Sequence, residues 1–139
     1  MTAATDPLRA LPGYLLRRAA SAMMAELSTR LATIDLRISE ASVLLLLGAR
    51  QAMTSSEIGK TLDIQRANMV PLVARLESAG LITRKPIDRK SQAIVLSAEG
   101  EARLGQVREI TNAFEKDLMG RIPDADRQHF VPALQALLA

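Results

Sequence analysis

The sequence predicts a mainly α-helical fold with a small β wing: a winged helix-turn-helix flanked by N- and C-terminal helices. Three observations support this fold class. A helix-capping pattern begins at Thr54, a second helical segment ends at Gly80, and two extended segments joined by a polar, basic tip follow before Gly100. This order is the outline of a module that places one helix in the DNA major groove and a hairpin beside it.

Two helices are predicted before this module. Apolar side chains recur every three or four residues over 12–34, the pattern of a long amphipathic helix. Ser39 is expected to cap a second helix over 40–49, and its VLLLL run is apolar on all sides, as in a helix at the centre of a core. The first ten residues are expected to be weakly ordered, with a local turn at Asp6-Pro7.

The helix-turn-helix follows. Met53 is expected to add a short third edge to the wing, and Thr54 with Glu57 has the spacing of a capping box that starts a short helix ending at Leu62. Asp63-Ile64 makes the turn to a second helix over 65–79, which Gly80 ends in a left-handed conformation. The expected core contacts of this second helix are Ile64, Val70, Val73, Leu76 and Leu81.

The wing and the outer helices complete the chain. Residues 81–85 and 92–96 are the two predicted strands, with a polar tip between them. Ser97 is expected to cap a long helix over 98–119 that Gly120 and Pro123 end. A last helix is expected over 124–138, bent at Pro132.

The three outer helices carry more apolar surface than a small winged-helix core covers. A second copy of the chain is the expected partner, because a two-fold dimer also gives two wings the spacing of two half-sites. The alternative is that all three helices cover one monomeric core.

Composition narrows the function classes. Of 139 residues, 48% are hydrophobic and only 2% aromatic, which predicts one domain with an aliphatic core. There is no cysteine, no signal-peptide order at the start and no apolar run near the roughly 20 residues of a membrane span. We therefore expect a cytoplasmic protein without membrane contact.

Positive charge is concentrated in the predicted DNA-facing region. Residues 64–95 contain six basic and two acidic side chains, or +4, in a chain of net charge +3. This distribution favours a nucleic-acid partner, and the alternative is a solvated basic face.

Several spaced motifs resemble the MarR family of bacterial transcriptional regulators. They are LESAGLITR at 76–84, DRK at 88–90 and VLSAEG at 95–100, and the resemblance extends from about Leu11 to Leu138. It implies a single domain over 1–139, with dimerisation helices at 1–38 and 104–139 and a winged helix-turn-helix lobe at 39–103. It also implies a homodimer that binds a pseudo-palindromic double-stranded DNA operator, usually as a repressor, and releases it on binding a small molecule. The alternative is a winged-helix protein-interaction or dimerisation module without sequence-specific DNA binding.

The second helix is expected to read bases. Gln65 and Asn68 carry amides that pair with adenine, Arg66 pairs with guanine, and Met69 or Pro71 would touch a thymine methyl. The alternative is that Asn68 is a local cap and Gln65 a solvent residue. Pro71 departs from the family, where a polar or basic residue is common. It either bends the helix or falls in its first turn, if the regular helix begins near Asn68.

Phosphate contacts are expected from the preceding helix and from the wing. Thr54, Ser55 and Ser56 lie at a helix N-terminus, where backbone N–H groups bind anions, although a plain capping box also explains them. Arg89 is expected to enter the minor groove, and the resemblance implies that Asp88 orients an arginine; the alternative is an Asp that caps the loop. The remaining expected contacts to the DNA backbone are Arg75, Arg84 and Lys90. For Arg75, the alternative is a surface charge.

The resemblance also implies a small-molecule effector, an aromatic or phenolic acid or its coenzyme A thioester. Tyr14, Arg17 and Arg18 are the candidate ligand-binding residues, because arginine suits a carboxylate or phosphate; the alternative is that the arginines are solvated or bridge a dimer. No cofactor, metal site or enzymatic activity is expected, since the chain has one histidine (His129), no cysteine and no phosphate-cradling glycine loop.

Overall fold

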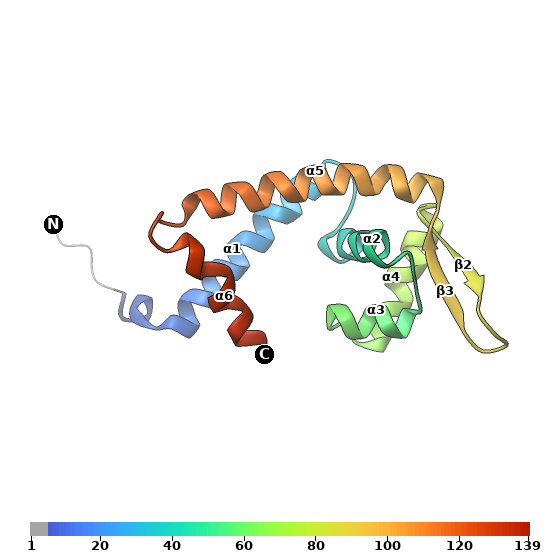
Figure 1. The fold of residues 1–139 in the computed structure, drawn as a ribbon, viewed down its shortest axis with the longest axis horizontal. Helices are drawn as coiled ribbons and strands as arrows, with labels where there is room; N and C mark the ends of the chain where they lie inside the picture. The colour runs from blue at the N-terminus through green and yellow to red at the C-terminus, as the bar shows by residue number, and fades with distance from the viewer. Residues whose placement is uncertain (1–5) are drawn as a thin grey trace.

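The computed structural model describes residues 6–139, so the part of the expected N-terminal turn region before Asp6 lies outside them (Figure 1). The described chain contains a mainly α fold with a small antiparallel sheet, which confirms the predicted fold class. Its elements are η1 (Pro7–Ala10), α1 (Pro12–Ala32), α2 (Ile38–Arg50), β1 (Ala52–Met53), α3 (Ser55–Leu62), α4 (Arg66–Ser78), β2 (Ile82–Pro86), β3 (Gln92–Leu96), α5 (Ala98–Arg121) and α6 (Arg127–Leu138).

The molecule is elongated. Helix α5 runs along most of the long axis of the molecule, with α2, α3, α4 and the sheet beneath one end and α1 and α6 beneath the other (Figure 1). The strands are ordered β1-β3-β2, and both pairs are antiparallel, with Met53 opposite Ile94 and Arg84 opposite Ile94 across the other edge of β3. Met53 therefore supplies the third edge expected of it.

Apolar side chains of α2, α4 and α5 form an aliphatic core. Leu44 and Leu47 of α2, Leu76 of α4, and Leu104 and Val107 of α5 are all 1% exposed or less. Each such side chain contributes about 1.5–3 kcal/mol on burial. Helix α2 is thus central, as its all-round apolar run predicts.

Local capping explains several helix ends. The Thr54 hydroxyl accepts from the Glu57 N–H at 3.1 Å, and the Glu57 carboxylate accepts from the Thr54 N–H at 3.3 Å, which confirms the capping box. Ser97 likewise caps α5 by accepting from the Gly100 N–H at 3.0 Å. Gly80 has a φ of 74°, the left-handed conformation expected there.

The start of α2 differs from the prediction. The helix begins at Ile38, and its N-cap is Arg37 rather than Ser39. The Glu40 carboxylate accepts from the Arg37 N–H at 2.8 Å, so an acidic side chain three residues into the helix replaces a serine cap. Ser42 instead donates back to the Ile38 carbonyl within the helix.

The outer segments also differ in detail. Helix α1 ends two residues earlier than expected, at Ala32. Asp6 caps a short 3-10 helix over Pro7–Ala10, which confirms the local turn expected at Asp6-Pro7 and extends it to a helical turn. Helix α5 continues through Gly120, and α6 begins only at Arg127, because residues 124–126 form a turn.

Helix α4 has a different phase from the one expected. Val70 is 70% exposed and Met69 is 2% exposed, so the predicted core contact of Val70 is wrong and Met69 takes its place. Pro71 is the sixth residue of the helix, so the alternative in which the regular helix begins near Asn68 and Pro71 falls in its first turn is wrong. Pro71 has no N–H to donate to the Ala67 carbonyl. Because Ala67 and Pro71 are both exposed, water can donate to that carbonyl instead.

Candidate nucleic-acid interface

A groove of about 970 Å³ separates α3 and α4 from the wing. Ten of its lining residues were expected to contact DNA: Thr54, Ser55, Ser56, Gln65, Arg66, Met69, Arg84, Asp88, Arg89 and Lys90. Lys60, Val70 and Gln92 line it as well and were missed. The fold therefore brings three distant parts of the sequence to one concave surface.

The N-terminus of α3 forms one end of this groove. The Thr54 hydroxyl is engaged in the capping box, while Ser55 is half-buried and Ser56 is exposed. The dipole of α3 and its first backbone N–H groups favour an anion at this position. The capping interpretation of Thr54 is thus confirmed, and phosphate binding beside it stays a prediction.

The first turn of α4 presents the expected polar side chains. Gln65 is the N-cap of α4, and Gln65, Arg66 and Asn68 are all exposed. The structure provides no side-chain cap from Gln65. Met69 points into the core, so its expected contact with a thymine methyl is wrong. The turn through Asp63, which has a φ of 55°, sets this phase.

Asp88 closes the tip of the wing. One of its carboxylate oxygens accepts from the backbone N–H groups of Lys90 and Ser91, each at 2.8 Å. Within residues 6–139 no ion pair joins Asp88 to an arginine, so the loop-capping interpretation describes the structure. Arg89 and Lys90 are exposed at this tip.

Arg84 connects the wing to α4. Its Nε lies 2.9 Å from Oε1 of Glu77, and its Nη2 lies 2.8 Å from the same oxygen. Both side chains are partly exposed. Arg84 therefore faces the groove while already holding an acidic partner.

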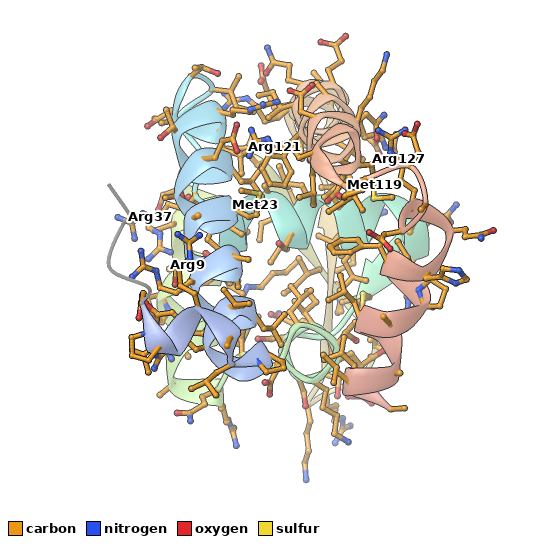
Figure 2. All side chains as sticks on the ribbon, turned by 90° about the vertical axis from the view of Figure 1, so that its left-hand side faces the viewer. Arg9, Met23, Arg37, Met119, Arg121 and Arg127 are labelled. Carbon is orange, nitrogen blue, oxygen red and sulfur yellow. The ribbon has the colours of Figure 1, made fainter. Side chains whose placement is uncertain are left out.

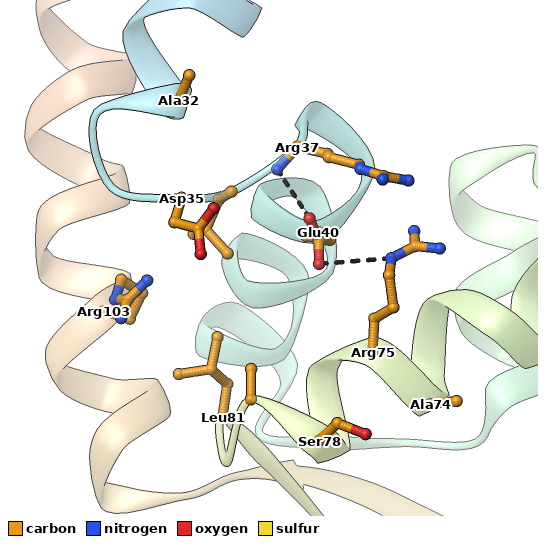
Figure 3. A pocket seen from close by; sticks show the side chains of 11 residues that line it. Ala32, Asp35, Arg37, Glu40, Ala74, Arg75, Ser78, Leu81 and Arg103 are labelled. Carbon is orange, nitrogen blue, oxygen red and sulfur yellow. Dashed lines mark hydrogen bonds and ion pairs between the residues drawn. The ribbon is translucent and has the colours of Figure 1, made fainter.

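Arg75 lies on another face of α4, in a second pocket of about 760 Å³ (Figure 3). Its Nε is 3.7 Å from Oε2 of the buried Glu40 and has no hydrogen-bond partner among the described residues. The expected DNA contact of Arg75 is therefore wrong for this conformation, because Glu40 of α2 holds the side chain away from the groove.

Three arginines surround this second pocket. Arg37 follows α1, Arg75 comes from α4, and Arg103 of α5 donates to the Ile34 carbonyl at 2.6 Å (Figure 3). Asp35 and Glu40 also line it. No sequence pattern could indicate this cluster, because tertiary packing alone brings its members together.

The first helix places its candidate ligand residues elsewhere. Arg17 and Arg18 lie 5.8 Å and 5.9 Å from the centre of the Tyr14 ring, and Arg18 also donates to the Tyr14 hydroxyl at 3.3 Å. None of the three lines either pocket. Both arginines are exposed, so this cluster is a local cation–π arrangement.

An ion network outside the lining of both pockets ties α1 to α5. Arg121 extends from α5 towards α1 and bonds Glu26 at 2.8 Å (Figure 2). Arg30 bonds Asp117 at 2.6 Å and Glu26 at 3.2 Å. The hydrogen bond from Arg121 lowers the pKa of Glu26, and the bond to Asp117 raises the pKa of Arg30. These charges link the two helices, and none of the four residues lines the groove between α3, α4 and the wing.

Among residues 6–139, no helix combines the length and the apolar character of a membrane span. The same residues contain no group of three or more His, Cys, Asp or Glu placed to hold a metal ion.

The amino-acid sequence is similar to those of known transcriptional regulators. The sequence model of the MarR family matches residues 36–91. The HTH-type transcriptional regulator PecS of Dickeya dadantii (strain 3937) is 34% identical over 93 residues, covering 66% of this chain and 54% of PecS. The chain spans about half the length of the curated relatives it matches.

Solved structures match over nearly the whole chain. The transcriptional repressor CouR bound to a 23-mer DNA duplex has a TM-score of 0.85 and 28% identity, covering 99% of both chains. CouR of Rhodococcus jostii RHA1 bound to p-coumaroyl-CoA has a TM-score of 0.82 and 24% identity, covering 96% of this chain and 95% of that one. In its winged helix-turn-helix, its flanking helices and these matches, the chain is similar to the MarR family.

Proposed function

We propose that the protein is a sequence-specific DNA-binding transcriptional regulator, a ligand-responsive repressor that binds a pseudo-palindromic operator as a homodimer. The observation that carries this proposal is the groove between α3, α4 and the wing. Arg66, Arg84, Arg89 and Lys90 line it beside the N-terminus of α3. The likeness to CouR, whose structure holds a 23-mer duplex, supports DNA as its occupant.

The geometry assigns each element a role on DNA. Helix α4 enters the major groove with Gln65, Arg66 and Asn68, whose amide and guanidinium groups read base edges. Arg89 at the wing tip enters the minor groove, where the negative potential is strong. The N-terminus of α3, Arg84 and Lys90 contact phosphates and fix the register.

Exposed apolar side chains on the outer helices support the homodimer. Among residues 6–139 they include Leu8, Leu11, Leu15, Leu16 and Met24 at the N-terminal end, and Val131, Leu137 and Leu138 on α6, with exposed fractions of 40–89%. Helix α6 has no buried residue within this single described chain. A symmetric interface formed by these helices would cover this surface and fix the distance between two DNA-reading lobes.

The second pocket is the better candidate for an effector site. Arg37, Arg75 and Arg103 offer charge-assisted hydrogen bonds to a carboxylate or phosphate, which suits an aromatic acid or its coenzyme A thioester. CouR bound to p-coumaroyl-CoA supports this ligand class. The Tyr14, Arg17 and Arg18 cluster remains an alternative site, because a dimer formed through the outer helices would change what surrounds it. Ala74, Arg75 and Ser78 of α4 line this pocket, and Arg66 and Val70 of the same helix line the DNA-facing groove, so one helix connects the two.

A gel-shift assay with promoter DNA from the protein's own gene tests the proposal. At about 150 mM salt, where non-specific binding is weak, the labelled duplex should be retained against an excess of scrambled duplex of the same composition. Equal competition by the scrambled duplex would instead favour a winged-helix protein-interaction module. A bacterial regulator must reach the chromosome, which lies in the cytoplasm. The proposal therefore includes a cytoplasmic location.

A further inference from the structure

The outward side of α4 is apolar, which is unusual for a helix expected to read base edges. Met69, Leu72, Val73 and Leu76 form its buried side, each 2% exposed or less. At 3.6 residues per turn the opposite side carries four small apolar residues: Ala67, Val70, Pro71 and Ala74. All four are exposed.

Val70 dominates this surface. Its exposed fraction is 70%, and of the large hydrophobic residues in 6–139 only Leu138 is more exposed. Ala67, Val70 and Pro71 therefore form an apolar patch on the N-terminal half of α4. Burial of such a patch against a partner is favourable, and no other part of the described chain covers it.

The surroundings of the patch identify its partner as DNA. Val70 lines the same groove as Arg66 of α4 and as Arg84, Arg89 and Lys90 of the wing. A basic rim around an apolar centre complements DNA. Its phosphates are negatively charged, and its base edges include apolar groups. Arg84 already pairs with Glu77, but a purely apolar protein partner would meet Arg66, Arg89 and Lys90 without compensation.

Base chemistry then narrows the target. In the major groove, guanine, cytosine and adenine present hydrogen-bond donors or acceptors, and only thymine adds an apolar group, the C5-methyl. Alanine, valine and proline side chains offer no hydrogen bond to the other groups. Contact with a thymine methyl is therefore the base interaction open to this patch.

We propose that Ala67, Val70 and Pro71 form a methyl-reading patch, in which Val70 selects thymine within each operator half-site. Gln65, Arg66 and Asn68 at the start of α4 read the flanking bases by hydrogen bonds. This assignment rests on the proposed function and makes Val70 a specificity-determining residue. The operator should accordingly contain thymines at the positions that α4 covers.

Thymine-to-deoxyuridine replacement tests the patch, because it removes only the C5-methyl. Duplexes are selected from a randomised library with the full chain, and each thymine of the best duplex is then replaced singly. Replacement at one or two positions per half-site should weaken binding about three- to five-fold, the value of one buried methyl-sized group. In Val70→Ser the ratio of thymine to deoxyuridine affinities at those positions should fall to about one.

Arg89→Ala is the matched control, since the wing tip should weaken both duplexes equally and leave that ratio unchanged. The exposed Val70 permits serine without loss of the fold, which the melting temperature of the variant checks. If no deoxyuridine replacement matters although one duplex is strongly selected, the patch is refuted and the proposed function stands. If the ratio persists in Val70→Ser, Val70 does not read the methyl. If no duplex is enriched, the proposed function itself fails, and the patch with it.

Discussion

Nε of Arg84 on β2 lies 2.9 Å from Oε1 of Glu77 on α4, so the wing and α4 share an ion pair. The side chains of Arg84 and Glu77 are 41% and 37% exposed, so the pair stabilises the fold by at most about 1 kcal/mol. Its main consequence is electrostatic. Under the proposed function, DNA phosphate must compete with Glu77 for Arg84.

Glu77→Gln should therefore increase operator affinity. The change removes a negative charge near the DNA and frees Arg84, so the logarithmic salt dependence should become steeper by up to about one unit. Fluorescence anisotropy over a salt series measures both quantities. Glu109→Gln, an exposed charge on α5, is the control and should have a smaller effect. A loss of affinity in Glu77→Gln would show that the pair is needed to position Arg84.

Arg89→Ala should weaken operator binding and reduce the salt slope by about one unit, because one phosphate-neutralising contact is lost. Arg9→Ala removes the same charge at the opposite end of the molecule, on η1 (Figure 2). Its slope should equal that of the unmodified protein. Equal slopes in all three proteins would rule out a DNA contact by Arg89.

Short-range signals made much of the fold predictable. Thr54 with Glu57, the left-handed Gly80 and Ser97 act through neighbouring backbone groups, so their helix ends could be located from the sequence. The order of these elements also predicted that polar residues of α3, α4 and the wing share one surface, because a winged helix-turn-helix brings these three elements together.

The phase of α4 could not be predicted. Met69, Val70, Leu72 and Val73 are all apolar, so their periodicity does not decide which of them is buried. The left-handed turn at Asp63 decides it, and that requires the backbone. Tertiary contacts were equally inaccessible: Arg75 meets Glu40 across 35 positions of sequence, a partner that no local pattern indicates.

A small acid or thioester that binds the second pocket should raise the melting temperature in proportion to the logarithm of concentration over Kd. Arg75→Gln should weaken such a ligand by about ten-fold or more, because a charge-assisted hydrogen bond is worth about 1.5–3 kcal/mol. Thermal shift assays across aromatic acids and their coenzyme A thioesters provide the measurement. Arg17→Gln on α1 is the control, and a selective loss in that variant would instead support the Tyr14, Arg17 and Arg18 site.

Two glycines on α5 should respond oppositely to alanine. A Cβ at Gly100 would collide with the Leu81 carbonyl, so Gly100→Ala should destabilise the protein by about 2–3 kcal/mol. Gly105 has open space around it within the helix, so Gly105→Ala should stabilise by up to about 1 kcal/mol. Chemical denaturation measures both. Similar stabilities for the two variants would contradict the close contact between Gly100 of α5 and Leu81.

Stability should fall at acidic pH through Glu26. Its pKa is lower in the folded protein than in the unfolded chain, chiefly because Arg121 donates a hydrogen bond to it. Its contribution is therefore present above the usual value of about 4.5 and is lost as the pH falls through the lower folded value. Melting temperatures from pH 3 to pH 7 should show a smaller acid-induced drop in Glu26→Gln. An identical drop would exclude a role for this carboxylate.

Selection of DNA by the full chain from a randomised duplex library, followed by sequencing, tests DNA reading most directly. A homodimer with one α4 and one wing per subunit should enrich two inverted half-sites whose centres lie about 10 base pairs apart. The inverted symmetry would show that two copies bind together, and the enriched bases would show that they read sequence. Recovery of duplexes with no shared bases would contradict the assignment of α4 and the wing as a sequence-reading surface.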